Sequence, residues 1–383
     1  MDFSLPLEID NLRSACDRLA TERLRVEMRE AETRRAWSEE ALAGLRSLGI
    51  SGLLVPRICA GDSNPLAAAV SLETIAGGDA GGLPLADQPG PASGALGFLV
   101  AFGEGFLGEQ ARRALAGCLE GRGHVGLSLV QDSAAATTVS WMPGNPDTLL
   151  AVCLVSPCTI RLVPRDSVSR ITRAGIGAFH ASGGISCEVG EGTEGSMSSP
   201  SFAVASRAVA RLWLASVMMG IGQAALDHAI SYGRDRIVFK VPVLAHQANA
   251  FEVARVTSAL SSARGLLHAA ATWLGNALEV CYSALEVPGR AGALPEEAEA
   301  SLVQASWMAT ASYREARTAV LSATDLGVQL LGGHGYMEDE PVEKLWREAR
   351  MLALWLGGDD MALDDMATDV LYLGDPLVLE AAK

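Results

Sequence analysis

The stretch Gln329–Asp360 reads QLLGGHGYMEDEPVEKLWREARMLALWLGGDD and decides the fold of this 383-residue chain. Its glycine pair Gly332-Gly333 separates two helical segments, since paired glycines favour a turn over a continuing helix. Charged residues then recur at spacings of three and four, which predicts a salt-bridged helix face: Glu343, Lys344, Arg347, Glu348 and Arg350. The stretch closes with an apolar run and a second glycine pair, Gly357-Gly358.

Outside this stretch, the pattern of apolar, charged and turn-forming residues changes twice along the chain. These changes predict an α+β multidomain protein. Residues 1–123 read as an N-terminal helical domain, in which Trp37-Ser38-Glu39-Glu40 has the form of a helix start. Residues 124–200 hold short apolar runs between proline and glycine clusters, which predict a small, reduced and mostly antiparallel β-domain. Residues 201–383 hold four long periodic segments, which predict a C-terminal four-helix bundle over 202–233, 243–285, 296–332 and 340–371.

Composition and charge exclude several classes of partner. The formal net charge of -15 disfavours nucleic acid and anionic membranes, because both need a basic surface. Seven cysteines without a C-x-x-C pair suit a reducing cytosol, and no histidine lies at ligand spacing to two cysteines, so we expect no metal site. The N-terminus does not read as a signal peptide, and the longest apolar run, Leu212–Ile221, is too short to span a bilayer. We therefore expect a cytoplasmic protein.

Four sequence motifs stand in a fixed order along the chain. The first is the opening MDFSLPLEIDNLR, and the second is LGISGLLVP at 48–56, followed by a helix that carries Glu73. The third is Y-x3-R-x2-F-x7-Q from Tyr232 to Gln247, and the fourth is Q-x-x-G-G-x-G-Y…P-V-E-K-x-x-R-E-A-R from Gln329 onward. In this order they resemble the motifs of the acyl-CoA dehydrogenase family. The resemblance covers the N-terminal and C-terminal thirds well and the middle third poorly.

The resemblance implies a flavoprotein that oxidises an acyl thioester of CoA or of a carrier protein. In this family a carboxylate removes the substrate α-proton while N5 of FAD accepts the β-hydride. By resemblance, Arg236 contacts the pyrophosphate of FAD held by a neighbouring subunit, and a guanidinium suits phosphate. The resemblance also implies that Phe239 and Gln247 lie near this cofactor. It places Gln329, Gly332 and Gly333 at the adenine end of FAD, and Asp360 near its ribose or adenine. An oligomer is also implied, as a homotetramer or as a pair with a homologous subunit.

The chain departs from the family at the catalytic base, so no catalytic residue is assigned. The family places its carboxylate either just before the second glycine pair or on the first bundle helix, next to an arginine. Those positions hold Leu356 and Ala210, and neither side chain can accept a proton. The segments that wrap flavin and acyl-CoA in the family have only weak counterparts here, in residues 127–133 and 141–144. Gly358 replaces a threonine that would donate to FAD, so the implied FAD site is partly eroded.

Three hypotheses follow from these motifs and departures. The first is an enzyme of acyl-CoA dehydrogenase type that acts alone or receives its base from a homologous subunit. The second is a non-catalytic subunit that scaffolds a partner and completes the partner's FAD site. The third is a flavin-dependent enzyme of another reaction type, such as an oxygenase, remodelled on this fold.

Overall fold

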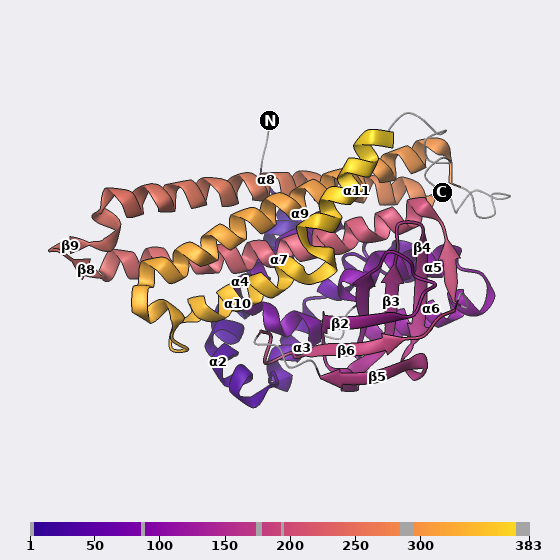
Figure 1. The fold of residues 1–383 in the computed structure, drawn as a ribbon, viewed down its shortest axis with the longest axis horizontal. Coiled ribbons are helices and arrows are strands. Elements are labelled where there is room, and N and C mark those ends of the chain that lie inside the picture. The colour runs from indigo at the N-terminus through magenta and orange to yellow at the C-terminus, as the bar shows by residue number, and fades with distance from the viewer. Residues whose placement is uncertain (1–3, 86–88, 174–177, 193–194, 284–293, 373–383) are drawn as a thin grey trace.

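The computed structural model describes residues 4–85, 89–173, 178–192, 195–283 and 294–372. Within them, N-terminal helices and a β-domain pack against a long helical bundle (Figure 1). The bundle extends beyond both at one end, where it finishes in a short hairpin (Figure 1). This architecture confirms the predicted fold class of N-terminal helices, a small β-domain and C-terminal bundle helices.

The first third of the described chain is helical. Helix α3 begins after Ser38, whose hydroxyl accepts a hydrogen bond from the Ala41 amide at 3.1 Å, as the sequence predicts. The side chain of Asn64 caps α4 in the same way, accepting from the Ala67 amide at 3.0 Å. The α-helices of this part are α1 (Leu7–Leu19), α2 (Arg25–Arg34), α3 (Glu39–Ser47), α4 (Pro65–Asp79), α5 (Ser93–Phe102) and α6 (Gly105–Leu119).

The β-domain contains two sheets, with strand orders β1-β3-β4-β7 and β2-β6-β5. Most neighbouring strands are antiparallel, as predicted, but β1 and β3 run parallel, with Val125 opposite Ala151. A parallel pair requires a crossover connection, and β2 forms it by joining the second sheet instead of pairing with β1. The strands are β1 (His124–Leu129), β2 (Thr137–Pro143), β3 (Leu149–Val155), β4 (Thr159–Pro164), β5 (Val168–Arg173), β6 (Gly184–Val189) and β7 (Ser196–Ser198).

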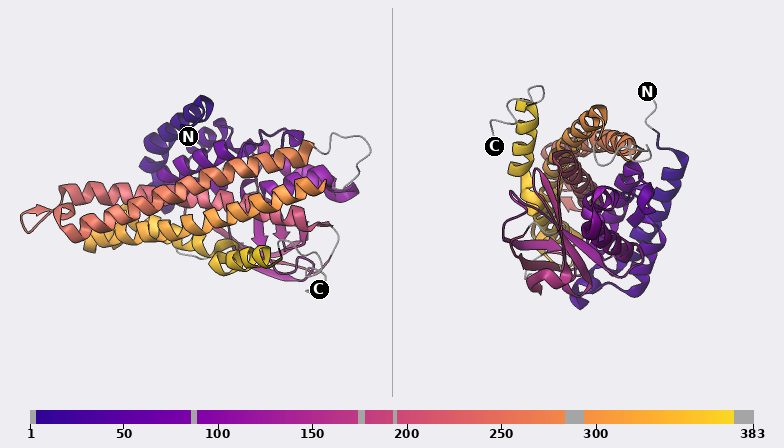
Figure 2. Two further views of the ribbon diagram at one scale, coloured as in Figure 1. Left: turned by 90° about the horizontal axis from the view of Figure 1, so that it is seen from above. Right: turned by 90° about the vertical axis from the view of Figure 1, so that its right-hand side faces the viewer.

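Helix α7 (Pro200–Asp235) is the core helix of the bundle. The N-terminal helices and the β-domain lie on two sides of the bundle (Figure 2). By length and composition α7 could cross a membrane, yet 89% of its most apolar window is buried inside the protein. The helices around it are α8 (Gln247–Ser283), α9 (Glu296–Leu331), α10 (Pro341–Leu354) and α11 (Gly358–Tyr372).

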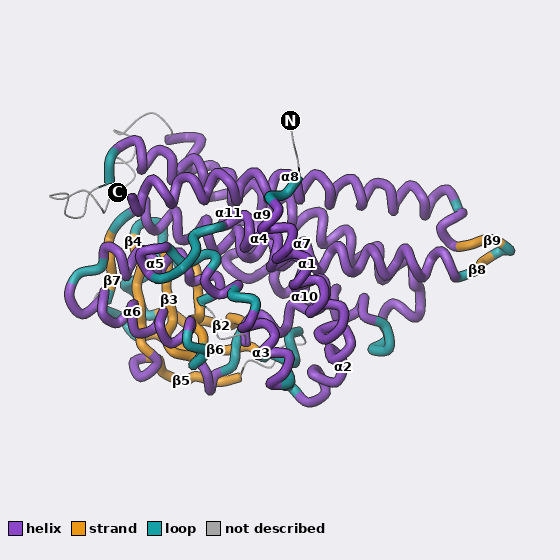
Figure 3. The backbone as a smooth tube through the Cα atoms, turned by 180° about the vertical axis from the view of Figure 1, so that it is seen from behind, coloured by secondary structure: helices purple, strands orange, loops and turns teal. Residues whose placement is uncertain are grey.

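A two-strand hairpin joins α7 to α8 at the far end of the bundle. It consists of β8 (Ile237–Val238) and β9 (Val241–Pro242), which pair antiparallel. Figure 3 shows it at the opposite end of the molecule from the other strands. The hairpin therefore projects away from the β-domain along the bundle axis.

The fourth bundle segment is broken at Leu356, where the sequence pattern predicts one continuous stretch. Leu356, Gly357 and Gly358 have φ angles of 60°, 82° and 61°. Glycine adopts positive φ freely, but a leucine there is strained because its Cβ approaches the backbone. The chain leaves the axis of α10 at this point, and α11 then packs against α9.

A buried lysine joins the N-terminal helices to α10. Lys344 is 1% exposed, and its Nζ donates to Asp79 Oδ1 at 2.9 Å and to Glu348 Oε1 at 2.5 Å. Both carboxylates are buried, so two acids face one ammonium. Burial raises the pKa of Glu348 to about 7, and the nearby carboxylate of Asp79 raises it as well. The ammonium of Lys344 acts in the opposite direction and lowers this pKa. The predicted salt-bridged face is confirmed, and in part it is an interior contact between domains.

Glu348→Gln should flatten the pH dependence of stability between the ordinary carboxyl pKa of 4.5 and about 7. In this window the folded state retains a proton that the unfolded chain has released, so wild-type stability falls as pH rises. The amide of the variant cannot titrate, and that slope should disappear from urea unfolding measured across the window.

Glu343→Gln is the matched control on the same helix. Despite partial burial, hydrogen bonds from Arg347 and Arg29 hold the pKa of Glu343 below its usual value. Its stabilisation is lost only as pH falls below the ordinary pKa, so this variant should keep the slope above 4.5. An unchanged slope in the Glu348→Gln protein would contradict the assignment.

Candidate functional site

The two positions at which the resembled family carries its catalytic carboxylate, Ala210 and Leu356, lie in the protein interior. Ala210 on α7 is fully buried, and Leu356, in the turn after α10, is 4% exposed. The turn meets α7 through Trp355, whose ring stands edge-on to that of Trp213 with centroids 6.0 Å apart. The structure therefore brings the two positions into one region, and both side chains are apolar there.

A buried ionic cluster stands beside Ala210. Arg207 and Arg211 point from α7 to Asp365 on α11, and Arg207 Nη2 lies 2.5 Å from both carboxylate oxygens. Arg211 also donates to Thr310 Oγ1 on α9 at 3.0 Å. Burial lowers the pKa of Arg211, and the carboxylate of Asp365 opposes that change. One carboxylate thus holds two buried guanidiniums and ties α11 to α7.

Asp365→Asn should destabilise the protein by about 3 kcal/mol, because it leaves two buried cations without a counter-charge. Urea unfolding followed by circular dichroism measures the loss. Asp364→Asn is the matched control, since Asp364 is exposed on the same helix and should change stability by no more than about 0.5 kcal/mol. Equal effects of the two substitutions would mean that the carboxylate of Asp365 is not the counter-charge.

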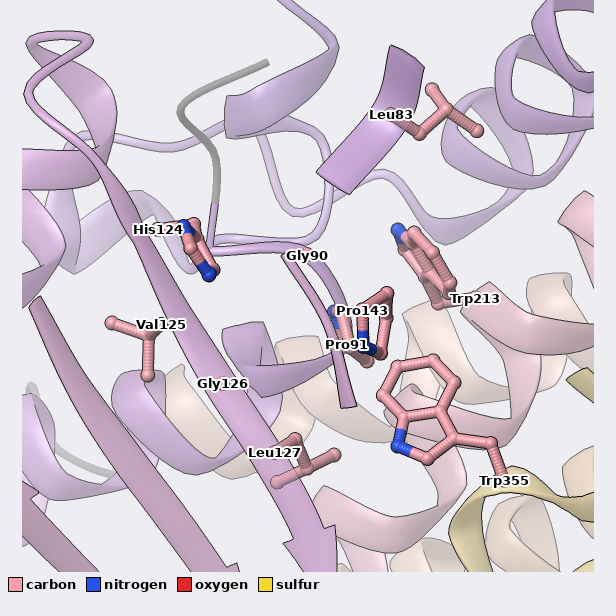
Figure 4. A pocket seen from close by; sticks show the side chains of 10 residues that line it. All are labelled: Leu83, Gly90, Pro91, His124, Val125, Gly126, Leu127, Pro143, Trp213 and Trp355. Carbon is pink, nitrogen blue, oxygen red and sulfur yellow. The ribbon is translucent and has the colours of Figure 1, made fainter. Parts of the chain in front are cut away.

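A narrow cavity lies between the β-domain and the bundle, next to the base positions. We call it the Trp355 cavity; Figure 4 shows its lining residues, Leu83, Gly90, Pro91, His124, Val125, Gly126, Leu127, Pro143, Trp213 and Trp355. Its volume is about 20 Å³, which is room for about one water molecule. Strand β1, the end of β2, α7 and the turn after α10 all contribute to its wall.

Tryptophans from three segments pack around the Trp355 cavity. Trp355 makes edge-to-face contacts with Trp213, described above, and with Trp141, at a centroid distance of 5.9 Å. The indole nitrogens of all three have no hydrogen-bond partner among the described residues, and neither does His124 Nε2. His124 Nδ1 lies 3.2 Å from Thr148 Oγ1, and burial lowers the pKa of His124 to about 4, so the ring is neutral near pH 7. The cavity wall is therefore aromatic and uncharged, with a few unused polar atoms.

The sequence patterns assign no role to Trp213 or Trp355. Of the seven tryptophans in the chain, three gather here from positions 141, 213 and 355. Such distant positions carry no common spacing, so only the fold brings them together. Residues 141–144 weakly resemble a family segment that wraps flavin and acyl-CoA. The structure places Trp141 and Pro143 of this segment at the junction.

The other predicted cofactor residues lie mainly at the far end of the bundle. Arg236 is exposed at the end of α7 and lines an open groove of about 370 Å³ with His228, Ser231, Tyr232, Asp235 and Glu340. Within the described part of the chain, no carboxylate lies within 4.0 Å of Arg236 to form an ion pair. An exposed guanidinium in an open groove is suited to a phosphate group.

Gln247, Gln329, Gly332 and Gly333 are exposed at this same end. The end of α7 reaches the turn after α9 through Tyr232 and His334, whose ring centroids are 6.3 Å apart. Gly332 has φ 59° and ψ -129°, which requires glycine, and open space surrounds the position of a Cβ there. Asp360 is also exposed, but it stands at the start of α11, near the Trp355 cavity rather than at the bundle end.

The hairpin at the bundle end is strained and apolar. Phe239 and Lys240 form its two-residue turn with φ of 49° and 68°, where asparagine and glycine are preferred. Phe239 is 89% exposed, and we call it and the exposed apolar residues beside it in the hairpin the hairpin patch: Ile237, Phe239 and Val241. A large apolar side chain held in solvent on a strained turn points to a contact with another molecule.

Comparisons with known proteins agree with this architecture. Residues 202–371 match the protein family described as acyl-CoA dehydrogenase, C-terminal domain. An acyl-CoA dehydrogenase of Bacillus subtilis (strain 168) is 31% identical over 159 residues, which are 42% of this chain and 35% of that protein. The matched region thus spans about a third of the length of that curated relative.

Solved structures extend the likeness to nearly the whole chain at the level of fold. Butyryl-CoA dehydrogenase from Megasphaera elsdenii has a TM-score of 0.73 at 17% identity, covering 97% of this chain and 100% of that chain. A nitrososynthase from Micromonospora carbonacea var. africana has a TM-score of 0.71 at 18% identity, covering 96% and 97%. Identities this low show the fold alone, and proteins with different activities share it.

Proposed function

We propose that this chain is a non-catalytic subunit of an acyl-CoA dehydrogenase-type flavoenzyme, because residues 202–371 match the acyl-CoA dehydrogenase C-terminal domain family and the chain shares the fold of butyryl-CoA dehydrogenase. Its partner is a homologous subunit that keeps the catalytic carboxylate. In the complex, the bundle end of this chain completes the FAD site of the partner, and the partner oxidises the acyl thioester. We place this complex in the cytoplasm.

The observation that carries this proposal is the separation between the two parts of the implied site. Trp213 marks the interior junction and Arg236 the end of the same helix, roughly 35 Å away at 1.5 Å per residue. One FAD molecule does not reach from one to the other within a single chain. Arg236 therefore serves a cofactor that another subunit holds.

The apolar base positions favour an unlike partner over a second copy of this chain. A pair of identical chains would place Leu356 and Ala210 at both sites, and neither site would have a proton acceptor. A homologous subunit that retains the carboxylate supplies the missing group. This reasoning also supports a hetero-oligomer over a homotetramer.

The chemistry of the bundle end suits the role of completing a partner's cofactor site. The guanidinium of Arg236 would bind the pyrophosphate, and Gln247 and Gln329 offer amide groups within the same exposed region. Gly332 and Gly333 leave the backbone open to close approach by the adenine end. The hairpin patch would provide the apolar contact area that an interface needs at its centre.

Co-expression with homologous subunits that keep a Glu or Asp base tests the proposed function. We expect a tagged chain to co-purify with one of them as a yellow complex, and an acyl-CoA to bleach its flavin under anaerobic conditions. Arg236→Ala should weaken FAD binding by the complex roughly 10- to 100-fold, the loss of one charge-assisted hydrogen-bonding group.

Arg234→Ala is the matched control, since Arg234 is exposed on the same helix end and lies outside the groove. It should leave FAD affinity unchanged. Bleaching of flavin by an acyl-CoA on this chain alone would overturn the non-catalytic assignment.

Phe239→Asn should raise the stability of the isolated chain and weaken the association of the complex. Asparagine tolerates the positive φ at this turn position, so the chain alone should gain about 0.5–1 kcal/mol in unfolding free energy. The complex loses an exposed aromatic anchor, so its dissociation constant should rise roughly 30-fold or more. Denaturant unfolding and analytical ultracentrifugation measure the two quantities.

Lys240→Asn relieves the other positive φ of the same turn without removing apolar surface. It should stabilise the chain similarly and leave association intact. If both variants associate as wild type does, the hairpin patch does not carry the interface.

A further inference from the structure

We infer that this chain cannot hold a flavin ring in its own interior, because tryptophan side chains fill the position that the ring would occupy. The inference goes beyond the proposed function, which concerns the other end of the bundle. In the proposed complex it means that two unlike chains share one FAD, held by the partner and completed by Arg236.

The place where a flavin ring would lie follows from the chemistry of the reaction. The ring must stand beside the base that takes the α-proton, because its N5 accepts the β-hydride from the adjoining carbon. By resemblance, it must also contact the segment that contains Trp141 and Pro143. The only region that adjoins both that segment and Leu356 within the described residues is the junction around the Trp355 cavity.

The free volume at this junction is too small for a tricyclic ring. The Trp355 cavity measures about 20 Å³, whereas the groove around Arg236, on the same measure, is about 370 Å³. The first accommodates about one water molecule. The space is limited by the indole of Trp355, which is 5% exposed and stands between Trp213 of the bundle and Trp141 of the β-domain.

The packing of this junction is that of a domain core. Trp355 meets both neighbouring rings at interplanar angles close to perpendicular, 87° and 89°, the edge-to-face arrangement that aromatic pairs prefer. Phe179 extends the cluster on the β-domain side, 5.8 Å from Trp141. Rotating Trp355 out to admit a ligand would break contacts with two domains at once.

The polar atoms around the cavity can be satisfied by a single small acceptor. The indole N–H groups of Trp213 and Trp355, which lack partners among the described residues, are donors, and both side chains are at least nine-tenths buried. His124 is the only titratable side chain in the wall within the described residues. One water molecule fits the volume and can accept from these donors.

The helices beside the second base position are also closely packed. A Cβ built on Gly94 of α5 would lie 2.9 Å from Val209 Cβ, so α5 and α7 pack almost in contact one residue from Ala210. Further along the same helices, Phe98 stacks on Phe202 with ring centroids 4.7 Å apart. Both places that the resemblance implies for flavin and substrate are thus closely packed in this chain.

Flavin binding by the isolated chain tests the inference without any activity measurement. Titration with FAD should leave the tryptophan fluorescence without saturable quenching and should leave the Tm unchanged, because a ligand that binds only the folded state raises the Tm. Trp355→Ala should lower the Tm by several degrees, as expected for a core tryptophan. Trp273→Ala, which removes an exposed tryptophan of α8, should not.

The variant Arg236→Ala separates the two ends of the bundle. Flavin that binds the isolated wild-type chain but not this variant occupies the bundle end, which agrees with the inference. One FAD per chain that persists in Arg236→Ala and raises its Tm would overturn it, as would a Trp355→Ala protein with the Tm of wild type.

The flavin content of the complex distinguishes this inference from the proposed function. A complex with one FAD per pair of unlike chains supports both. A complex with two FAD molecules per pair overturns this inference and leaves the proposed function standing. A flavin-free chain that associates with no homologous subunit supports this inference and overturns the proposed function.

Discussion

Three consecutive positive φ angles at residues 356–358 set the relation between the parts of this molecule. They end α10 with Trp355 turned into the junction between the β-domain and the bundle. They also redirect the chain into α11, whose Asp365 reaches the two buried arginines of α7. A strained leucine within such a turn persists only where its surroundings hold it in place. The position that the resemblance implies for the base thus lies in a strained turn and carries an apolar side chain.

The filled junction and the open bundle end have different physical characters. At the junction, aromatic side chains from the β-domain and the bundle are buried against one another, and this burial stabilises the fold. At the bundle end, the surface carries an exposed guanidinium, a strained turn and apolar side chains in solvent, none of which stabilises an isolated chain. The junction therefore contributes to folding stability, whereas the bundle end exposes its side chains to solvent.

The pattern of residues 329–360 and the four periodic segments were enough to predict the fold class. Local chemistry also located helix starts, as at Ser38, because a cap depends on a few neighbouring residues. The parallel pairing of β1 with β3 and the burial of Lys344 depend on contacts between distant segments, which spacing does not encode. For the same reason the sequence could mark Leu356 as an odd residue, while the tryptophans that surround it emerged only from the structure. The roles assigned to Arg236 and its neighbours remain predictions, although the structure places most of them at one exposed end.

The hairpin patch also has a consequence for the life of the chain in a cell. In the proposed complex, a subunit made in excess of its partner would display Phe239 and two aliphatic side chains, Ile237 and Val241, on a projecting hairpin, a surface of the kind that chaperones and proteases recognise. Pairing would hide this signal. The cell would thereby keep the two subunits in balanced amounts without any regulation of their synthesis, since surplus copies of this chain would be cleared by the same contact surface that their partner requires.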